Sequence, residues 1–197
     1  MKIVAGIDAL DTPRLFAAAS RRIILHAALY GAFANSEAHC NGLMEAIQKP
    51  EFKRLDIIAL DPSHSPDWTA SFFEVLRFGI STQGITDEVA LSHKFLTELT
   101  ARYPDKIRLH TARRLPSLPI LVADDTIIFG QYAHAQEHAP QGFWGMVKTD
   151  VERLLDWTET GKAPTEATNE DIAAFRLINE CVRAMTNNLN PPQKCTP

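Results

Sequence analysis

Two apolar runs with an amphipathic segment between them constrain the fold of this chain more than any other feature. The run Ile23–Phe33 is apolar at nearly every position, and Arg54–Asp61 is a second such run. Strands buried on both faces have this pattern, because helices cover both sides of their sheet. Between the runs, Asn35 or Ser36 is suited to cap a helix and Pro50 to end it. The pattern predicts a βαβ unit, although the alanines in the first run leave a helix there open.

The remaining elements extend this unit into an α/β fold. The sequence predicts, in order, helices opening at Ser65 and Thr86, an edge strand over 107–112, a hairpin over 115–134, a strand over 142–147, a helix capped by Thr149 with Glu152 and ended by Gly161, and a last helix from Thr168. We therefore expect a mixed central β-sheet flanked by helices on both faces, plus a C-terminal helix.

The domain organisation follows from this order of elements. We expect an α/β domain over 1–160, a linker and an amphipathic helix over 161–190, and a disordered tail over 191–197. The apolar stripe of the last helix must be buried, and we expect it to pack on its own domain, with a partner protein as the alternative. This stripe consists of Ile172, Phe175, Ile178, Val182 and Met185.

Charge and composition narrow the classes of partner. The 197 residues carry a formal net charge of −4, which provides no general attraction to nucleic acid or to an anionic membrane. No apolar segment has the form of a secretion signal or is long enough to span a bilayer, so we expect a soluble, cytoplasmic protein. Cys40, Cys181 and Cys195 are scattered, which predicts reduced thiols and no zinc site.

The predicted hairpin Leu115–His134 carries the most specific motif. Two apolar runs flank the acidic pair Asp124 and Asp125, which is typical of a tight turn. The spacing of this stretch resembles the signature of the phospholipase D superfamily, which is H-x-K, four residues, Asp, six residues and G-S-x-N. Asp124 takes the place of the family's Asp, and Gly130 that of its Gly. The element order over about residues 15–160 is also similar to one half-domain of that superfamily.

The sequence departs from the family at the residues that perform its chemistry. Ser117 stands at the place of the nucleophilic His and Pro119 at that of the Lys, while Gln131 and Ala133 replace Ser and Asn. The second spacer is also one residue shorter. A serine needs a neighbouring base to act as a nucleophile, and proline offers neither a charge nor a proton-transfer group.

The resemblance implies a non-catalytic, degenerate module of phospholipase D type that binds an anionic ligand or a protein partner. The resemblance also implies a homodimer, because family members with one motif copy are expected to bring two motifs together across a two-fold axis. We expect no cofactor and no metal. We expect the ligand-binding cleft to contain His110, Arg113, Ser117, Asp124, Gln131 and His134.

Several of these residues have a second interpretation. Arg113 suits an anion clamp but also a solvated surface position, and Asp124 is equally explained by turn chemistry. His134 and His138 have a spacing that would bind a metal on a helix, but Pro140 favours a polar loop. The alternative function is a phosphodiesterase or nuclease-type hydrolase with an altered site that uses His134, His110 and Arg113. A third is docking of the C-terminal helix to another protein.

Overall fold

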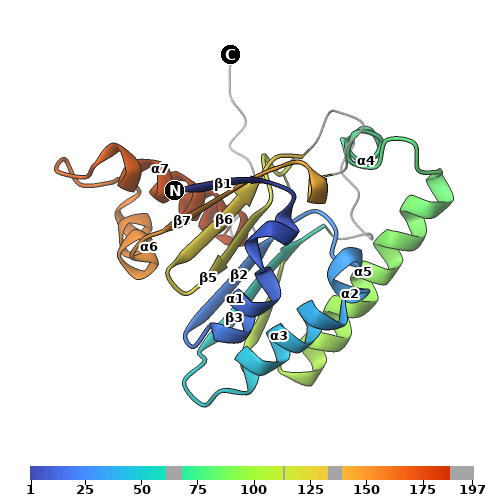
Figure 1. The fold of residues 1–197 in the computed structure, drawn as a ribbon, viewed down its shortest axis with the longest axis horizontal. Helices are drawn as coiled ribbons and strands as arrows, with labels where there is room; N and C mark the ends of the chain where they lie inside the picture. Colours follow the sequence, from blue (N-terminus) through green and yellow to red (C-terminus); the bar gives the residue numbers. More distant parts are fainter. Residues whose placement is uncertain (61–67, 113, 133–138, 187–197) are drawn as a thin grey trace.

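The chain folds around one mixed seven-stranded sheet (Figure 1). We describe a computed structural model over residues 1–60, 68–112, 114–132 and 139–186. The strand order is β1-β7-β6-β5-β2-β3-β4, in which β2, β3 and β4 are parallel and the other neighbours antiparallel. The strands are β1 (Lys2–Ala5), β2 (Arg22–His26), β3 (Arg54–Ala59), β4 (Ile107–Thr111), β5 (Ile120–Ala123), β6 (Thr126–Gly130) and β7 (Phe143–Lys148).

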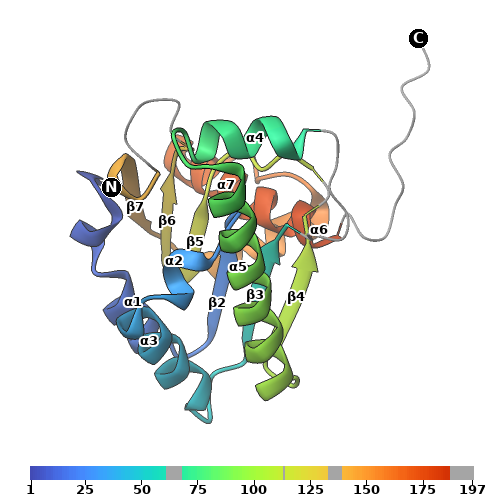
Figure 2. The same cartoon turned by 90° about the vertical axis from the view of Figure 1, so that its right-hand side faces the viewer.

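Helices cover both faces of the sheet, as the sequence predicts. Figure 2 shows α2, α3 and α5 in front of the sheet, with α6 and α7 behind it. The longer helices are α1 (Thr12–Ala18), α3 (Glu37–Gln48), α4 (Thr69–Leu76), α5 (Thr82–Arg102), α6 (Val151–Thr160) and α7 (Asn169–Thr186). The short ones are α2 (Gly31–Ala34) and the 3-10 turns η1 (Ile7–Leu10) and η2 (Ala139–Gln141). The α/β class is confirmed.

Alternate residues of β2 supply the cores of the two faces. Ile23 and Leu25 pack with α1, α3 and α5, whereas Ile24 packs with α6 and α7. The βαβ prediction is confirmed, because β2 and β3 are parallel neighbours joined through α3. Ser36 caps α3 by accepting a hydrogen bond from the backbone N–H of His39.

The first apolar run is a strand only over its first part, so the prediction of one strand over Ile23–Phe33 is wrong at its end. β2 stops at His26, and the chain turns into α2 at Gly31. The hydroxyl of Tyr30 lies 3.0 Å from the carbonyl oxygen of Leu25 and 2.7 Å from that of Ile58. This buried side chain occupies the space beyond the strand end, so the apolar character of the run reflects burial rather than continued pairing.

Several predicted boundaries also shift. The second long helix begins after Ser81 rather than at Thr86, and the N-cap of α6 is Asp150, one residue after Thr149. The sequence did not predict β1, whose residues are mostly exposed and pair only with β7. The helix start at Ser65 and the tail over 191–197 lie outside the described residues.

The C-terminal helix packs on its own chain. Phe175, Ile178 and Cys181 of α7 are buried in one core with Ile24 of β2 and Ile58 of β3. Thr168 and Asp171 form a capping box at the predicted start of this helix. The backbone N–H of Asp171 donates to the Thr168 hydroxyl at 3.1 Å, and that of Thr168 donates to the Asp171 carboxylate at 3.3 Å. The apolar stripe therefore completes the core of the second face.

Candidate binding site at the carboxyl end of the sheet

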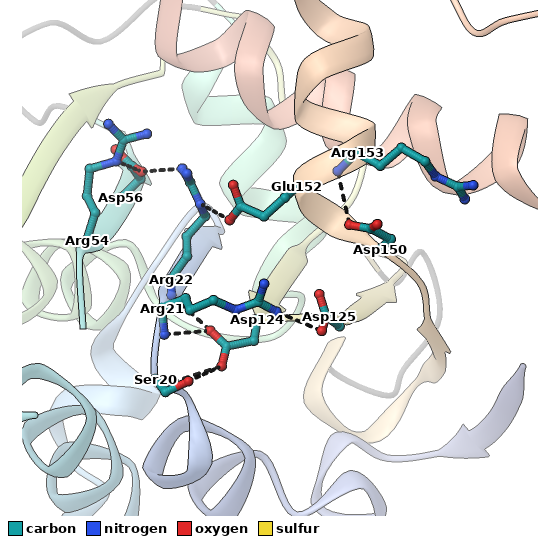
Figure 3. A network of polar contacts seen from close by, with 10 residues as sticks. All are labelled: Ser20, Arg21, Arg22, Arg54, Asp56, Asp124, Asp125, Asp150, Glu152 and Arg153. Carbon is teal, nitrogen blue, oxygen red and sulfur yellow. Dashed lines mark hydrogen bonds and ion pairs between the residues drawn. The ribbon is translucent and has the colours of Figure 1, made fainter. Parts of the chain in front are cut away.

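The predicted hairpin forms, and Asp124 lies at its tip. Asp124 has a φ of 45°, a left-handed conformation that aspartate tolerates in tight turns. Its Oδ1 accepts backbone hydrogen bonds from Arg21 and Arg22, both at 2.9 Å (Figure 3). Its Oδ2 accepts from the backbone N–H and the hydroxyl of Ser20 at 2.8 and 3.1 Å. Burial raises the pKa of this carboxyl, but these donors outweigh it and hold the pKa below its usual range.

Asp124 lies at the opposite end of the strands from the other described candidates, which are His110, Ser117 and Gln131. Because β5 runs antiparallel to β2, Ala123 lies opposite Ile23 at the start of β2, while Ile120 lies opposite His26 at its end. Ser117 precedes β5 and Gln131 follows β6, so both lie at the end of the hairpin opposite to Asp124. Asp124 therefore lies apart from Ser117 and Gln131. Arg113 and His134 lie outside the described residues.

Gly130 also has a structural role. A Cβ atom at this position would lie 2.8 Å from ring atoms of Trp144, which covers the glycine from the neighbouring strand. The Asp and the Gly that match the phospholipase D signature are thus both explained by the geometry of the hairpin.

His110 is held by a buried carboxylate. Its Nε2 lies 3.0 Å from Oδ1 of Asp56, whose side chain is 1% exposed. Arg54 donates to the other oxygen of Asp56 at 2.6 Å, and Arg22 links Asp56 to Glu152 (Figure 3). Burial raises the pKa of Asp56, but the hydrogen bond from His110 and the charge of Arg54 outweigh it, so the pKa is lowered.

One cavity brings part of the predicted segment together with α7. We call it the α7 pocket; it has a volume of about 170 Å³ and lies beyond the carboxyl ends of β2 and β4. Parallel strands commonly present ligand sites at this edge. The pocket is lined by His26, Ala112, Arg114, Leu115, Pro116, Glu180, Arg183 and Ala184.

The charges of the α7 pocket favour an anion. Arg114 comes from the segment before β5 and Arg183 from α7, and neither forms an ion pair with another described residue. The acidic member, Glu180, accepts a hydrogen bond from the Ser117 hydroxyl at 3.3 Å. Two guanidinium groups against one carboxylate leave a net positive pocket whose donors suit an oxyanion.

His26 provides a buried imidazole in the same pocket. The residue is 2% exposed, and its Nδ1 has no hydrogen-bond partner in the described part of the chain. Burial lowers its pKa to about 4, so the ring is neutral at pH 7. A neutral imidazole offers one donor and one acceptor to a ligand.

The sequence indicated this pocket only in part. It singled out the segment around Arg113 and Ser117, but not Glu180 and Arg183, which belong to a helix that was interpreted as a packing element. Their spacing along α7 is ordinary for an exposed helix face, so no local pattern marks them. Only the packing of α7 against the sheet brings them to the segment before β5.

No metal centre is formed by the described residues. None of their His, Cys, Asp and Glu side chains gathers in a group of three or more that could hold an ion. The predicted pair His134 and His138 falls outside them. No described helix is long and apolar enough to cross a membrane.

The comparisons with known proteins found structural likeness but no related sequence family. No family model matches the chain, and no curated protein does. Among solved structures, it is similar to TrmBL2, an archaeal chromatin protein whose structure shows a novel mode of DNA binding, with a TM-score of 0.47 and 16% identity. The match covers 80% of this chain and 48% of TrmBL2, so the chain spans about half the length of that protein. A likeness of this size carries no argument about function.

Proposed function

We propose that this chain is a non-catalytic binding module that holds a small oxyanion in the α7 pocket. The observation that carries the proposal is the convergence of Arg114, Arg183 and the buried imidazole of His26 on one cavity. Guanidinium groups bind phosphate and carboxylate oxygens through paired hydrogen bonds. The pocket volume of about 170 Å³ suits a phosphate or carboxylate on a short organic body rather than a large ligand.

The absence of catalysis is proposed from the surroundings of Ser117. Its hydroxyl donates to Glu180, and no described histidine is hydrogen-bonded to it. Pro119 is buried at the end of the hairpin and supplies no charge. The residues that replace the family's His and Lys therefore lack the base and the cation that phosphodiester cleavage of that type uses.

Calorimetric titration with inorganic phosphate tests the binding site. Arg183→Ala and Arg114→Ala should each weaken binding by about tenfold or more, because each removes a charge-assisted contact. Arg176→Ala is the matched control, since this arginine is exposed on the same helix and does not line the pocket. Equal binding of phosphate by Arg183→Ala and Arg176→Ala would overturn the proposal. So would the absence of phosphate binding at millimolar concentration.

An activity screen tests whether the module is non-catalytic. The substrates are a chromogenic phosphodiester, single-stranded and duplex nucleic acid, and a phospholipid vesicle. We expect no turnover above that of the His110→Asn variant. Turnover that this variant loses would contradict the proposal and support a hydrolase.

A hydrolase is the second candidate because Asp56 orients an imidazole. A carboxylate that fixes a histidine is a common arrangement in general acid–base catalysis, and the Asp56–His110 contact has this form. The site would then use His110 with Arg113 and His134. Loss of activity in His110→Asn, Arg113→Ala and His134→Ala, with folding intact, is the result this alternative requires.

We also propose a homodimer, on the basis of the resemblance to single-motif phospholipase D proteins. In such an assembly, two copies would face each other across a two-fold axis. Sedimentation velocity at micromolar concentration measures the assembly directly. A single species with the mass of one chain would contradict this proposal without affecting the phosphate titration.

A further inference from the structure

A larger cavity lies on the opposite face of the sheet, at the same carboxyl edge. We call it the α2 pocket; its volume is about 360 Å³. His26 faces the α7 pocket, and the next residues, Ala27 to Leu29, line the α2 pocket. The remaining lining comes from η1, α2, α3, the end of α4, β5, η2 and β7.

The walls of the α2 pocket are mainly apolar. Phe33, Tyr132 and Trp144 contribute aromatic rings, and Leu76 and Leu121 contribute aliphatic side chains. Protein interiors are usually packed without voids of this size, because an unfilled apolar cavity forfeits dispersion contacts along its whole lining. The volume lies in the range of small-molecule sites.

The charged groups at the α2 pocket disfavour an anionic ligand. Arg77 is committed to Glu88, to which its Nε donates at 2.6 Å and its Nη2 also donates. Asp8 is exposed at the mouth and would repel an anion. His39 has both ring nitrogens in contacts of 2.8 Å, with Ser36 and Thr12, and burial lowers its pKa. No unpaired cation faces the cavity from the described residues that line it.

A cationic ligand is also disfavoured inside the cavity. A buried ammonium group needs a partner of opposite charge, and Asp8 is solvated at the mouth rather than inside. The lining residue Tyr132 is 8% exposed, and its hydroxyl oxygen is almost fully shielded from solvent. The backbone of Ala28 lies beside this hydroxyl, but no described residue forms a hydrogen bond of good geometry with it. Burial raises the pKa of Tyr132, so it stays a neutral phenol.

We infer that the α2 pocket binds a neutral, largely apolar small molecule that carries one hydrogen-bonding group. The apolar body would fill the space between Phe33, Trp144 and Leu121, and its polar group would meet the Tyr132 hydroxyl. This site is separate from the oxyanion site and does not depend on it.

Three ligands that share one body and differ in charge test this inference. The probes are biphenyl-4-methanol, biphenyl-4-carboxylate and biphenyl-4-methylamine, titrated calorimetrically into the full chain. We expect the alcohol to bind about tenfold or more tightly than either charged analogue, since neither charge has a buried partner. Tighter binding of the carboxylate or the amine, or no binding of the alcohol, would overturn the inference.

The location is tested by narrowing the mouth of the cavity. Ala32 lines the pocket from α2 and is exposed, so Ala32→Leu adds volume at the mouth without disturbing the core. Ala38→Leu is the matched control on the exposed face of α3. Ala32→Leu should weaken binding of the alcohol by about tenfold or more, and Ala38→Leu should not. Equal binding by both variants would place the ligand elsewhere.

Tryptophan fluorescence provides a second readout if Ala32→Leu should be unstable. In a Trp68→Phe, Trp157→Phe background, Trp144 is the single remaining indole. The alcohol should change its emission with the same affinity as in calorimetry. An unchanged emission at saturation would contradict the proposed location.

Discussion

The Oδ2 atom of Asp124 accepts two hydrogen bonds from Ser20, one from its backbone N–H at 2.8 Å and one from its hydroxyl at 3.1 Å. With the backbone donors of Arg21 and Arg22, this contact fixes the hairpin tip to the start of β2. The relation explains why the two segments, about a hundred residues apart, adopt a fixed register.

We expect Asp124→Asn to lower the free energy of unfolding by about 2 kcal/mol or more, because an amide offers one acceptor oxygen to donors that now bind two. Asparagine tolerates the same backbone conformation, so the loss reports the carboxylate. The control is Asp125→Asn, which removes one exposed ion pair with Arg21 and should cost less than about 1 kcal/mol. Urea unfolding at pH 7 measures both, and equal losses would contradict the expectation.

Removing the buried charge of Asp56 should lower the free energy of unfolding by more than Asp124→Asn does. Asp56→Asn should destabilise the protein by about 3 kcal/mol, because Arg54 and Arg22 keep their charges near a partner that no longer has one. The folded-state pKa of Asp56 is below its unfolded value, so its contribution is present above about pH 4 and is lost as the pH falls. The difference between wild type and variant should shrink in acid. A difference that is constant from pH 7 to pH 3 would contradict this.

Local patterns predicted most of the elements, and long-range contacts explain what they missed. The hairpin, the βαβ unit and the helix start at Thr168 each depend on residues close in sequence, so periodicity and turn chemistry were sufficient. The role of Asp124 depends on donors about a hundred residues away, and the α7 pocket on Arg183 approaching Arg114. The four mostly exposed residues of β1 carry no alternation that would mark a strand.

Two glycines in the antiparallel part of the sheet are predicted to resist substitution. Phe129 covers Gly145, as Trp144 covers Gly130, and a Cβ on Gly145 would lie 2.6 Å from the Phe129 ring. Gly145→Ala should therefore cost about 1–3 kcal/mol. Combining it with Phe129→Leu should recover part of that loss in a double-mutant cycle of thermal unfolding. Additive losses would show that the ring and the glycine are not coupled.

The lowered pKa of His26 predicts that the protein loses stability in mild acid. Protonation of His26 should also be coupled to anion binding in the α7 pocket. The pKa of this histidine is about 4 in the folded protein and about 6.5 when unfolded, so its contribution is complete above about pH 6.5 and declines as the pH falls toward 4. Full protonation would cost about 3 kcal/mol. His26→Gln should remove this pH dependence in urea unfolding between pH 7 and pH 4.

A bound anion should change the protonation of His26, because His26 lines the α7 pocket together with Arg114, Arg183 and Glu180. Burial lowers the pKa of His26, and an oxyanion bound in the same pocket would supply a negative charge that favours the imidazolium. Phosphate affinity should therefore rise as the pH falls from 7 to 5, beyond the change expected from the ionisation of phosphate itself. Sulfate, whose charge is constant over this range, separates the two causes, since its affinity changes only through the protein. His26→Gln should make sulfate binding independent of pH, and an unchanged pH dependence in this variant would exclude His26 from the site.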